Sequence, residues 1–497
     1  MPRDPVIPGT PEDFGRTLDD LQWVDQFVAA IRPYVRVRLS DSVLIKMPTE
    51  VYALNPQGAR LLDRALAGTP IARIAADCGA AGDPDRLFQV HAFFCDLRDL
   101  LSGALGEGSG RLATDTDRFT GSFTARPVMA EVALTYSCNL ACRFCYAGCG
   151  DAEAGPGNPG REPGRRRWPW QRRPAVAPDR VMTTGEIRRV IDILADEAEV
   201  PSLSFTGGEP TLHPQLPELI AHAAGRGMRV NLITNGLRCA EPRYVARLVD
   251  AGLTSAQVSL EGADAETHEG LTQRPGTFAK TLRGLANLRA AGLTVHTNTT
   301  VSRANAHALA GIVDLAADLG LPHLSMNFLI PTGSSRLGKH GDLAMTYAEI
   351  GSHVLAAKQR AKDRAIGFHW YSPTPFCLFN PVAHGLGNKG CAACDGLIHV
   401  APSGEVRPCS SFAGGVGNLL TDGFEAVWNG ADARYYRAKR HAPAACKACP
   451  HFALCQGACP LYWAERGTGE LRRAAWAAVR GRVAGSLQGL GRWRRRR

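Results

Sequence analysis

The sequence lacks any apolar run of the roughly 18 residues that a membrane-spanning helix needs, so no transmembrane segment is expected. It also lacks, at its start, the charged flank and apolar stretch of a secretory signal. We therefore expect a cytoplasmic protein. In that reducing compartment cysteines bind metals or stay free, and they rarely form disulfides.

Little of the net charge of +10 is spread evenly over the chain. Much of the excess lies in three arginine-rich stretches, at 165–167, 172–173 and 494–497. Local charge of this kind says little about the folded body, so nucleic acid is not an expected partner. A nucleic-acid or acidic-peptide contact near 150–180 and a membrane-surface helix within the basic tail 463–497 stay as alternatives.

The amino-terminal region predicts a small domain at 33–106, preceded by a tail at 1–32 and followed by a linker at 107–127. Residues 1–30 carry no clear element. Alternating apolar residues predict three strands, and longer periodicities predict three helices. The strands are expected at 34–39, 43–47 and 51–54, and the helices at 57–67, at 70–77 and from Pro84 to Leu101. This order is typical of a winged-helix-like fold.

The run VRVRLSDSVLIKMP, followed by VYALNPQGARLLDRALAG and a long apolar helix, resembles the PqqD-like domain, also called the RiPP recognition element. The resemblance covers residues 33–105. It implies that a precursor peptide binds residues 33–106 through its leader, which adds as an extra strand at the sheet edge, against the third helix. A winged-helix DNA-binding domain is the alternative, although no helix here has the Arg or Asn residues of a recognition helix.

Strands and helices alternate between residues 128 and 340. The predicted strands are 130–136, 202–206, 228–234, 255–260, 293–301 and 323–330. Repeated βα units imply parallel strands with helices outside, so we predict an α/β fold, a partial (β/α)6 TIM-like barrel with its active site at the carboxyl ends of the strands. An insertion near 150–180, rich in Gly, Pro and Arg, is expected to be disordered. Residues 341–376 are expected to form a connecting helix.

A short loop after the first barrel strand brings three cysteines together in the spacing C-x3-C-x2-C: Cys138, Cys142 and Cys145. Thiolates favour zinc or iron–sulfur, and zinc would need a fourth close ligand. Three cysteines on a 4Fe–4S cluster leave one iron free to bind a substrate group. Cys149, four residues further on, is taken as a free thiol.

This loop is similar to the signature of the radical S-adenosylmethionine (SAM) superfamily, with Phe144 at the usual aromatic position. The resemblance implies that the free iron binds SAM, and that a reduced cluster splits SAM into methionine and a 5′-deoxyadenosyl radical. An electron donor such as flavodoxin or ferredoxin is then an expected partner. Cys239 or Tyr146 is a candidate hydrogen donor.

Further SAM contacts are expected where the strands end. Gly207-Gly208-Glu209-Pro210 looks like the family's GGE motif, which binds the SAM amine. Glu261 stands where an aspartate is more usual. The expected contacts from later strand ends are Asn235, Ser259, Glu261, Asn298 and Thr300, each of which could instead cap a helix or a turn. His268 and Arg274, in the following loop, are candidate substrate contacts.

Eight more cysteines crowd residues 377–462. Cys391, Gly404 and Cys409 fit C-x12-G-x4-C, and Cys446 begins the string C-x2-C-x5-C-x3-C that ends at Cys459. The pattern resembles the SPASM domain of peptide-modifying radical SAM enzymes. It implies auxiliary 4Fe–4S clusters, one held by Cys391, Cys394, Cys409 and Cys459 and a second held by Cys446, Cys449 and Cys455.

The family expects one more cysteine downstream, and none follows Cys459. Either Cys377 fills that place, or one cluster keeps an open iron, and Cys377 and Cys391 could also trade roles. Paired zinc knuckles are the bland alternative for these thiols.

Together these features predict a radical SAM enzyme that modifies a ribosomally made precursor peptide by hydrogen-atom abstraction, forming a crosslink, a thioether or another oxidation. Two alternatives stay open: a radical enzyme that acts on a folded protein, like the sulfatase-maturing relatives, and a non-enzymatic binding protein with zinc knuckles.

Overall fold

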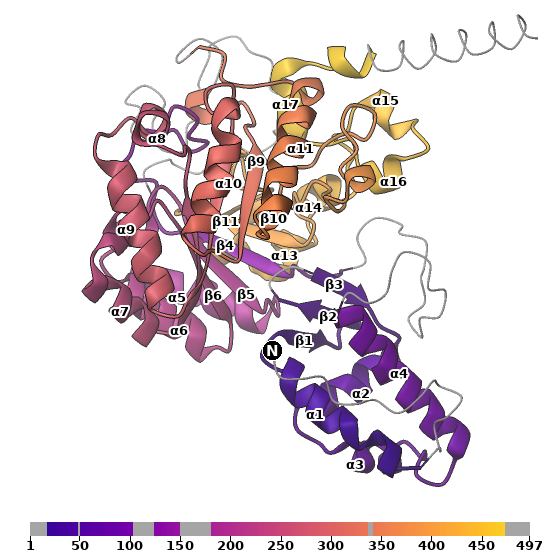
Figure 1. Ribbon diagram of the computed structural model, residues 1–497. Helices are drawn as coiled ribbons and strands as arrows, with labels where there is room; N and C mark the ends of the chain where they lie inside the picture. Colours follow the sequence, from indigo (N-terminus) through magenta and orange to yellow (C-terminus); the bar gives the residue numbers. More distant parts are fainter. Residues whose placement is uncertain (1–16, 48–49, 103–123, 150–179, 336–340, 473–497) are drawn as a thin grey trace, which may run out of the picture. The chain divides into compact units, whose positions relative to one another are not determined.

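The structure is a computed structural model that describes residues 17–47, 50–102, 124–149, 180–335 and 341–472 (Figure 1). The chain divides into two compact units, Met1–Val128 and Met129–Arg497. The predicted insertion at 150–179 lies outside the described residues, as does most of the predicted basic tail. None of the helices in the described ranges is long and apolar enough to cross a membrane.

The first unit packs helices against a three-stranded antiparallel sheet of order β1-β2-β3. Its strands are β1 Val35–Arg38, β2 Val43–Lys46 and β3 Glu50–Ala53, and its helices are α1 Gln22–Ile31, α2 Pro56–Leu66, α3 Ile71–Asp77 and α4 Pro84–Ser102. The three strands and the last three helices match the predicted elements to within about two residues. Apolar periodicity located them because each element buries one face.

Helix α1 is the element that the prediction missed. The expectation that residues 1–30 carry no clear element is wrong, because Gln22–Ile31 is helical. Leu21, Val24 and Val28 follow one another at intervals of about one helical turn. All three are at most 2% exposed and lie in the core of this unit. Asp25 further accepts a hydrogen bond from the backbone N–H of Ile71 at 2.9 Å, which ties α1 to α3.

The second unit is built on one ten-stranded sheet of order β10-β9-β8-β7-β6-β5-β4-β11-β12-β13. Its strands are β4 Met129–Ala133, β5 Ser202–Thr206, β6 Arg229–Thr234, β7 Leu253–Ser259, β8 Thr294–Val301, β9 His323–Phe328, β10 Gly367–Trp370, β11 Leu397–Val400, β12 Glu405–Arg407 and β13 Gly417–Asn418. All neighbours from β10 to β11 pair in parallel. The α/β fold with a parallel sheet is therefore confirmed.

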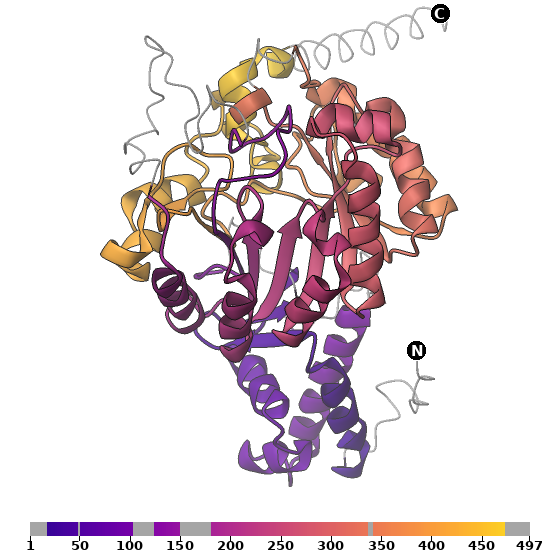
Figure 2. The same cartoon turned by 90° about the vertical axis from the view of Figure 1, so that its left-hand side faces the viewer.

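Helices line the outside of this sheet (Figures 1 and 2). They are α5 Thr184–Asp196, α6 Leu216–Gly225, α7 Pro242–Asp250, α8 Ala265–Thr272, α9 Thr277–Ala290, α10 Leu309–Asp318 and α11 Tyr347–Asp363. Helix α5 shows why they form: a capping box of Thr183 and Glu186 starts it, and it buries Ile187, Val190 and Leu194 along one side. Parallel strands need such crossover helices.

The sheet is wider than the six strands that the sequence predicts. Strand β10 lies within 341–376, where only a connecting helix was expected, and follows α11. At the other edge, β11 comes from the cysteine-rich region and pairs in parallel with β4. The cysteine-rich region therefore continues the barrel sheet next to the strand that leads into the cysteine loop.

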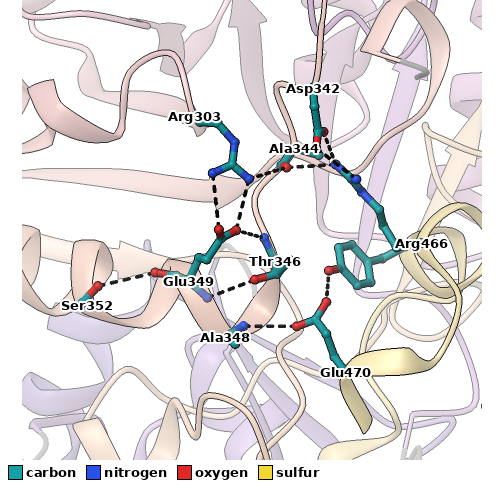
Figure 3. Close-up of polar contacts among 10 residues, drawn as sticks. Arg303, Asp342, Ala344, Thr346, Ala348, Glu349, Ser352, Arg466 and Glu470 are labelled. Atoms are coloured by element: carbon teal, nitrogen blue, oxygen red, sulfur yellow. Dashed lines mark hydrogen bonds and ion pairs between the residues drawn. The ribbon is translucent and has the colours of Figure 1, made fainter. Parts of the chain in front are cut away.

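The carboxyl-terminal region ends in short helices: α12 Leu419–Asp422, α13 Phe424–Trp428, α14 Ala431–Arg437, α15 Ala444–Lys447, α16 Phe452–Cys455 and α17 Pro460–Arg466. Figure 3 shows how polar contacts hold its last part to the start of α11. Arg466 pairs with Asp342 and donates to the Ala344 carbonyl at 2.9 Å. Glu470 accepts from the backbone N–H of Ala348 at 3.2 Å. These contacts fix the segment that follows Cys459.

Candidate active site and cysteine clusters

The loop that follows β4 carries Cys138, Cys142 and Cys145 at the carboxyl end of the strand, as the sequence predicts. Its backbone is anchored to the end of α8, because Ala141 and Arg143 donate to the carbonyls of Thr272 and Leu271 at 3.1 and 3.0 Å. Backbone N–H groups point at two sulfur atoms: Leu140 donates to Cys138 Sγ and Cys149 donates to Cys145 Sγ, each at 3.4 Å. Such donors stabilise thiolates.

The three thiols lie close enough to influence one another's protonation. Burial, the neighbouring Cys145 thiolate and Glu261 raise the pKa of Cys142 well above its usual value. Burial raises the pKa of Cys138 to about 12. A hydrogen bond from Cys149 lowers the pKa of Cys145 to about 7. Cys149 is buried: its thiol donates to the Tyr136 carbonyl at 2.9 Å, and its backbone N–H is the group that donates to Cys145 Sγ.

The glycine pair at the end of β5 packs directly on this loop. A Cβ at Gly207, where φ is +136°, would lie 2.2 Å from the Thr135 carbonyl oxygen, and one at Gly208 would lie 2.4 Å from that of Ser137. Gly208 also donates to the Thr135 carbonyl at 2.7 Å. The absence of side chains therefore lets the loop backbone approach the strand end, which sets the position of the cysteines.

Glu209 is fully buried, and its carboxylate is already occupied within the fold. Oε1 accepts from Thr234 Oγ1 at 2.7 Å and from the backbone N–H and hydroxyl of Thr211, and Oε2 accepts from the Asn235 N–H at 2.8 Å. Burial raises the pKa of Glu209, and these donors oppose the rise. Three of these four donors reach Oε1 and one reaches Oε2, so the group joins β5 to β6 while Oε2 keeps acceptor capacity. A contact from Glu209 to the SAM amine stays a prediction.

Glu261 follows β7 and is 2% exposed. Its Oε2 accepts from the Thr300 N–H at 2.9 Å, and burial raises its pKa to about 8. His268 accepts from the Glu261 backbone N–H at Nδ1, and burial lowers the pKa of His268 to about 4. Its Nε2 is buried and has no hydrogen-bond partner among the residues that the structure describes. His268 is thus a neutral buried group beside Glu261, whereas Arg274 is exposed.

The remaining candidate residues surround the same end of the sheet. Asn235 donates to Asn139 Oδ1 in the cysteine loop at 2.7 Å. Asn298 donates to Asn327 Oδ1 at 2.7 Å and accepts from Ser325. Phe144 packs against Leu329, Leu343 and Ala344. Pro210 begins a short 3₁₀ helix. Ser259, the last residue of β7, is half-buried. Of the two candidate hydrogen donors, Tyr146 donates to the Gly207 carbonyl at 3.2 Å and Cys239 is buried in the core.

The eight later cysteines divide into two groups. We call Cys391, Cys394, Cys409 and Cys459 the first set. Burial and the neighbouring thiolates of Cys391 and Cys459 raise the pKa of Cys409, and Cys391 likewise raises the pKa of Cys394 and of Cys459. Cys391, Cys394 and Cys459 are at most 9% exposed and belong to the main core.

We call Cys377, Cys446, Cys449 and Cys455 the second set. Burial and the thiolates of Cys455 and Cys449 raise the pKa of Cys377, and Cys377 contributes in turn to the raised pKa of Cys446. The backbone N–H of Phe376 donates to Cys455 Sγ at 3.4 Å. Cys377 and Cys449 are exposed. The structure therefore places Cys377 beside the carboxyl-terminal cysteine string, near Cys455 and Cys449.

The donor chemistry of all three groups fits iron–sulfur clusters. They offer three, four and four thiols, several with N–H donors on sulfur. In the ranges that the structure describes, no three His, Cys, Asp or Glu side chains converge closely enough to hold a single metal ion. A 4Fe–4S cluster takes each cysteine on a different iron, so its ligands stand further apart.

One polar pair, His399 and Glu131, was not predicted from the sequence. His399 on β11 lies 3.0 Å from Glu131 on β4, and the histidine is completely buried. Within the described ranges of the chain, its Nε2 has no hydrogen-bond partner. The two residues are 268 positions apart, so no local pattern could have linked them.

Two family models match the chain. The radical SAM superfamily matches residues 132–316, and the iron–sulfur cluster-binding SPASM domain matches residues 391–450. These matches cover the cysteine loop and most of the first set. The chain is therefore an enzyme, and its cofactors are S-adenosylmethionine and 4Fe–4S clusters. A protein built on zinc knuckles is excluded.

Similar proteins differ in what their names describe. The chain is 28% identical over 359 residues to AdoMet-dependent heme synthase of Nitratidesulfovibrio vulgaris, covering 68% of this chain and 88% of that protein. It is 29% identical over 349 residues to mycofactocin maturase MftC of Mycobacterium ulcerans, covering 67% and 83%. The crystal structure of Streptococcus suis SuiB bound to precursor peptide SuiA has the same fold, with a TM-score of 0.59, 15% identity and coverage of 86% and 94%.

Proposed function

We propose that this enzyme is a maturase that modifies a ribosomally synthesised precursor peptide. The observation that carries the proposal is the combination, in one chain, of a radical SAM loop, two sets of four cysteines and an amino-terminal three-stranded unit whose strand β3 has no outer neighbour among the described residues. The similarity to mycofactocin maturase and to SuiB, which was crystallised with its precursor peptide, supports it.

Cys138, Cys142 and Cys145 are the proposed ligands of the SAM-binding cluster. When bound, this cluster and SAM supply the 5′-deoxyadenosyl radical that removes a hydrogen atom from the peptide. The chain's own part is positional. Gly207 and Gly208 hold the loop against β5, Asn235 holds it against the end of β6 through Asn139, and Glu261 faces Cys142 from the end of β7.

The two cysteine sets are the proposed ligands of two auxiliary clusters, with Cys377 as the fourth ligand of the second. The contact between the Phe376 N–H and Cys455 Sγ supports this placement, since it brings the preceding segment to the sulfur of a set-two member. Cys391 pairs instead with Cys394 and Cys409. Two auxiliary clusters suit an oxidation, because a substrate radical must lose one more electron. A flavodoxin or ferredoxin is the proposed external electron donor.

The first unit is the proposed leader-binding domain. Its order of three strands and three helices agrees with the PqqD-like pattern, and α1 is an addition to it. The SuiB match covers 86% of this chain, more than the 369 residues of the second unit alone provide, so it extends into residues 1–128. Strand β3 ends the sheet and leaves one edge open in the described part of the chain.

The leader site has a specific test at Ala53, which is exposed on β3. Leu54 donates its N–H to Ser42 O, toward β2, so the alternation of an antiparallel ladder directs the Ala53 N–H to the open edge. Ala53→Pro removes that donor, and Ala53→Val keeps it. We expect Ala53→Pro to weaken binding of the leader peptide about fivefold, the value of one hydrogen bond of about 1 kcal/mol. Equal affinities in the two variants would argue against strand addition at β3.

The proposed reaction is tested by anaerobic incubation of the reduced, reconstituted enzyme with SAM and the peptide encoded by a neighbouring short reading frame. We expect 5′-deoxyadenosine and a peptide that is lighter by two hydrogens. The Cys142→Ala variant, which removes a ligand from the SAM-binding loop, should release neither. If the mass of the peptide stayed unchanged while 5′-deoxyadenosine was abundant, the proposal that the enzyme oxidises the peptide would be wrong.

A second candidate is a haem precursor as substrate, because the similarity to the heme synthase of Nitratidesulfovibrio vulgaris is as strong as that to the maturase. The two readings differ in what the first unit does. If a haem precursor is converted while the peptide is not, and if a chain that begins at residue 124 converts it equally well, the peptide proposal fails.

A further inference from the structure

Two basic side chains enter the first cysteine set from one short segment. Lys439 is 5% exposed, and its Nζ donates to the Cys391 carbonyl and pairs with Asp395 Oδ2 at 2.7 Å. Arg437, at the end of α14, donates from Nε to the Cys394 carbonyl at 3.0 Å. Each cation is therefore bound to the backbone of a different cysteine in the same set.

The backbone of Lys439 shows that its side chain is retained at some cost. Lys439 has a φ of +52°, just beyond the end of α14, in the left-handed region where helices commonly place glycine. A residue with a side chain is disfavoured there by about 1 kcal/mol or more. A buried ammonium adds a further desolvation cost unless it is paired. Glycine would relieve the backbone cost but would leave Asp395 without the ammonium that it pairs with, so the position keeps a strained backbone together with a buried ion pair.

Arg437 is held as firmly. Its guanidinium lies over the ring of Trp428, 4.4 Å from the centroid, and Nη2 donates to the Trp428 carbonyl at 2.9 Å. Asp395 pairs with Lys439, and Glu131 also acts on the Cys409 thiol, so Lys439 and Arg437 are the two cations of a set that also faces two carboxylates. Lys439 lowers the pKa of Cys391, and Arg437 and Lys439 lower that of Cys394, against the rise caused by burial.

The second set has the opposite environment. The charged groups that affect the Cys377 thiol are the thiolates of Cys455 and Cys449 and the carboxylate of Glu470, and all of them raise its pKa. Cys446 responds to burial and to other thiolates of the set. Its members Cys377 and Cys449 are also exposed, so water screens charge there far better than in the first set.

We propose that Lys439 and Arg437 raise the reduction potential of the cluster bound by the first set above the value that the same buried cluster would have without them. Reduction of a 4Fe–4S cluster adds one electron and therefore one negative charge, and a cation fixed in a low-dielectric interior stabilises that charge. The proposal rests on the proposed assignment of the eight cysteines. The raised reduction potential makes the buried cluster a better acceptor for the electron that a substrate radical must lose.

The test is an anaerobic redox titration of the full chain, followed by electron paramagnetic resonance, without peptide. The background is a Cys138→Ala, Cys142→Ala, Cys145→Ala protein, which leaves the auxiliary clusters alone. Cys394→Ser and Cys446→Ser each alter one ligand and so assign each signal to its set. If neither changes a signal, the cysteine assignment fails, which is distinct from failure of the tuning.

In this background we expect Lys439→Met to lower the midpoint potential of the first-set cluster and to leave that of the second unchanged. Arg437→Gln should shift it in the same direction. Asp395→Asn, which leaves both cations in place, should raise it. Lys358→Met removes a half-buried lysine that binds the carbonyls of His384 and Gly385, and serves as the matched control with no shift.

The set of variants still tests the proposal if one of them does not fold. If Lys439→Met fails to take up iron, Asp395→Asn still decides, because it adds net positive charge without burying a new group. An unchanged potential in Asp395→Asn, or equal shifts of both clusters in any variant, overturns the proposal. Lys439→Arg should retain the wild-type potential, which separates charge from mere packing.

Discussion

The first and second cysteine sets contain the same number of thiols but lie in different surroundings. Three members of the first set are at most 9% exposed and pack in the main core. Two members of the second set are exposed, and the set is drawn from a surface string and from Cys377. Equal ligand chemistry is therefore placed in two dielectric environments, and the protein can tune the buried cluster far more than the exposed one.

The difference also concerns how each set is assembled. The first set joins three segments: the turn at Cys391–Cys394, the strand end near Cys409 and the start of α17 at Cys459. Cys459 is linked to α11, because its N–H donates to the Tyr347 hydroxyl at 3.4 Å. The first set thus connects the sheet to α17, whereas the second set connects surface loops.

The largest expected effect of this difference is on stability. Cys394→Ser should lower the free energy of unfolding by about 3 kcal/mol more than Cys377→Ser, since cluster binding at the first set also holds the core together. Each variant should lose about four iron atoms. Iron analysis and thermal unfolding under anaerobic conditions measure both quantities.

Cys78→Ser is the control for that comparison, because Cys78 is exposed in the first unit and its thiol only donates to the Ala75 carbonyl. It should change neither iron content nor stability. Equal destabilisation by Cys394→Ser and Cys377→Ser would mean that the buried set does not stabilise the fold more than the exposed one.

A smaller effect is expected on chemical access. Iron chelators and oxygen should remove the second cluster about tenfold faster than the first, because reaching the first set requires local opening of the core. In the Cys138→Ala, Cys142→Ala, Cys145→Ala background, which leaves only the auxiliary clusters, iron release should then follow two phases, and Cys377→Ser should abolish the fast one. If Cys377→Ser instead lost the slow phase and kept the fast one, the second set would be the less accessible of the two.

Much of this architecture could be predicted from local sequence. The strands β4 to β9 of the second unit were predicted close to their bounds because each buries a continuous or alternating apolar face, whereas β10 to β13 were not predicted. The cysteine loop was located because its three ligands lie within eight residues. Helix α1 was missed although Leu21, Val24 and Val28 carry a helical spacing, since the interpretation gave no weight to a short pattern near the chain start.

Long-range pairings could not be predicted in the same way. Strand β11 joins β4 across most of the second unit, and the Glu131–His399 pair depends on that pairing. Lys439 is 48 residues from the carbonyl that it binds, and its neighbours in sequence do not distinguish it from a surface lysine. Cys377 was left between two roles because spacing alone does not fix which loop folds back onto the string. Three-dimensional packing decides such contacts.

The smallest expected effect tests the link between Cys459 and α11. The Tyr347 hydroxyl accepts from the Cys459 N–H and donates to the Pro373 carbonyl at 3.2 Å, and its ring packs on Phe328, Tyr462 and Trp463. Tyr347→Phe keeps the ring and removes both hydrogen bonds, so it should cost about 1 kcal/mol of unfolding free energy. Because Cys459 belongs to the first set, the electron paramagnetic resonance signal of that cluster should change while that of the second stays the same. Tyr34→Phe, at an exposed tyrosine of the first unit, should leave both signals and the stability unaltered. A change confined to the second cluster in Tyr347→Phe would place Cys459 in the other set.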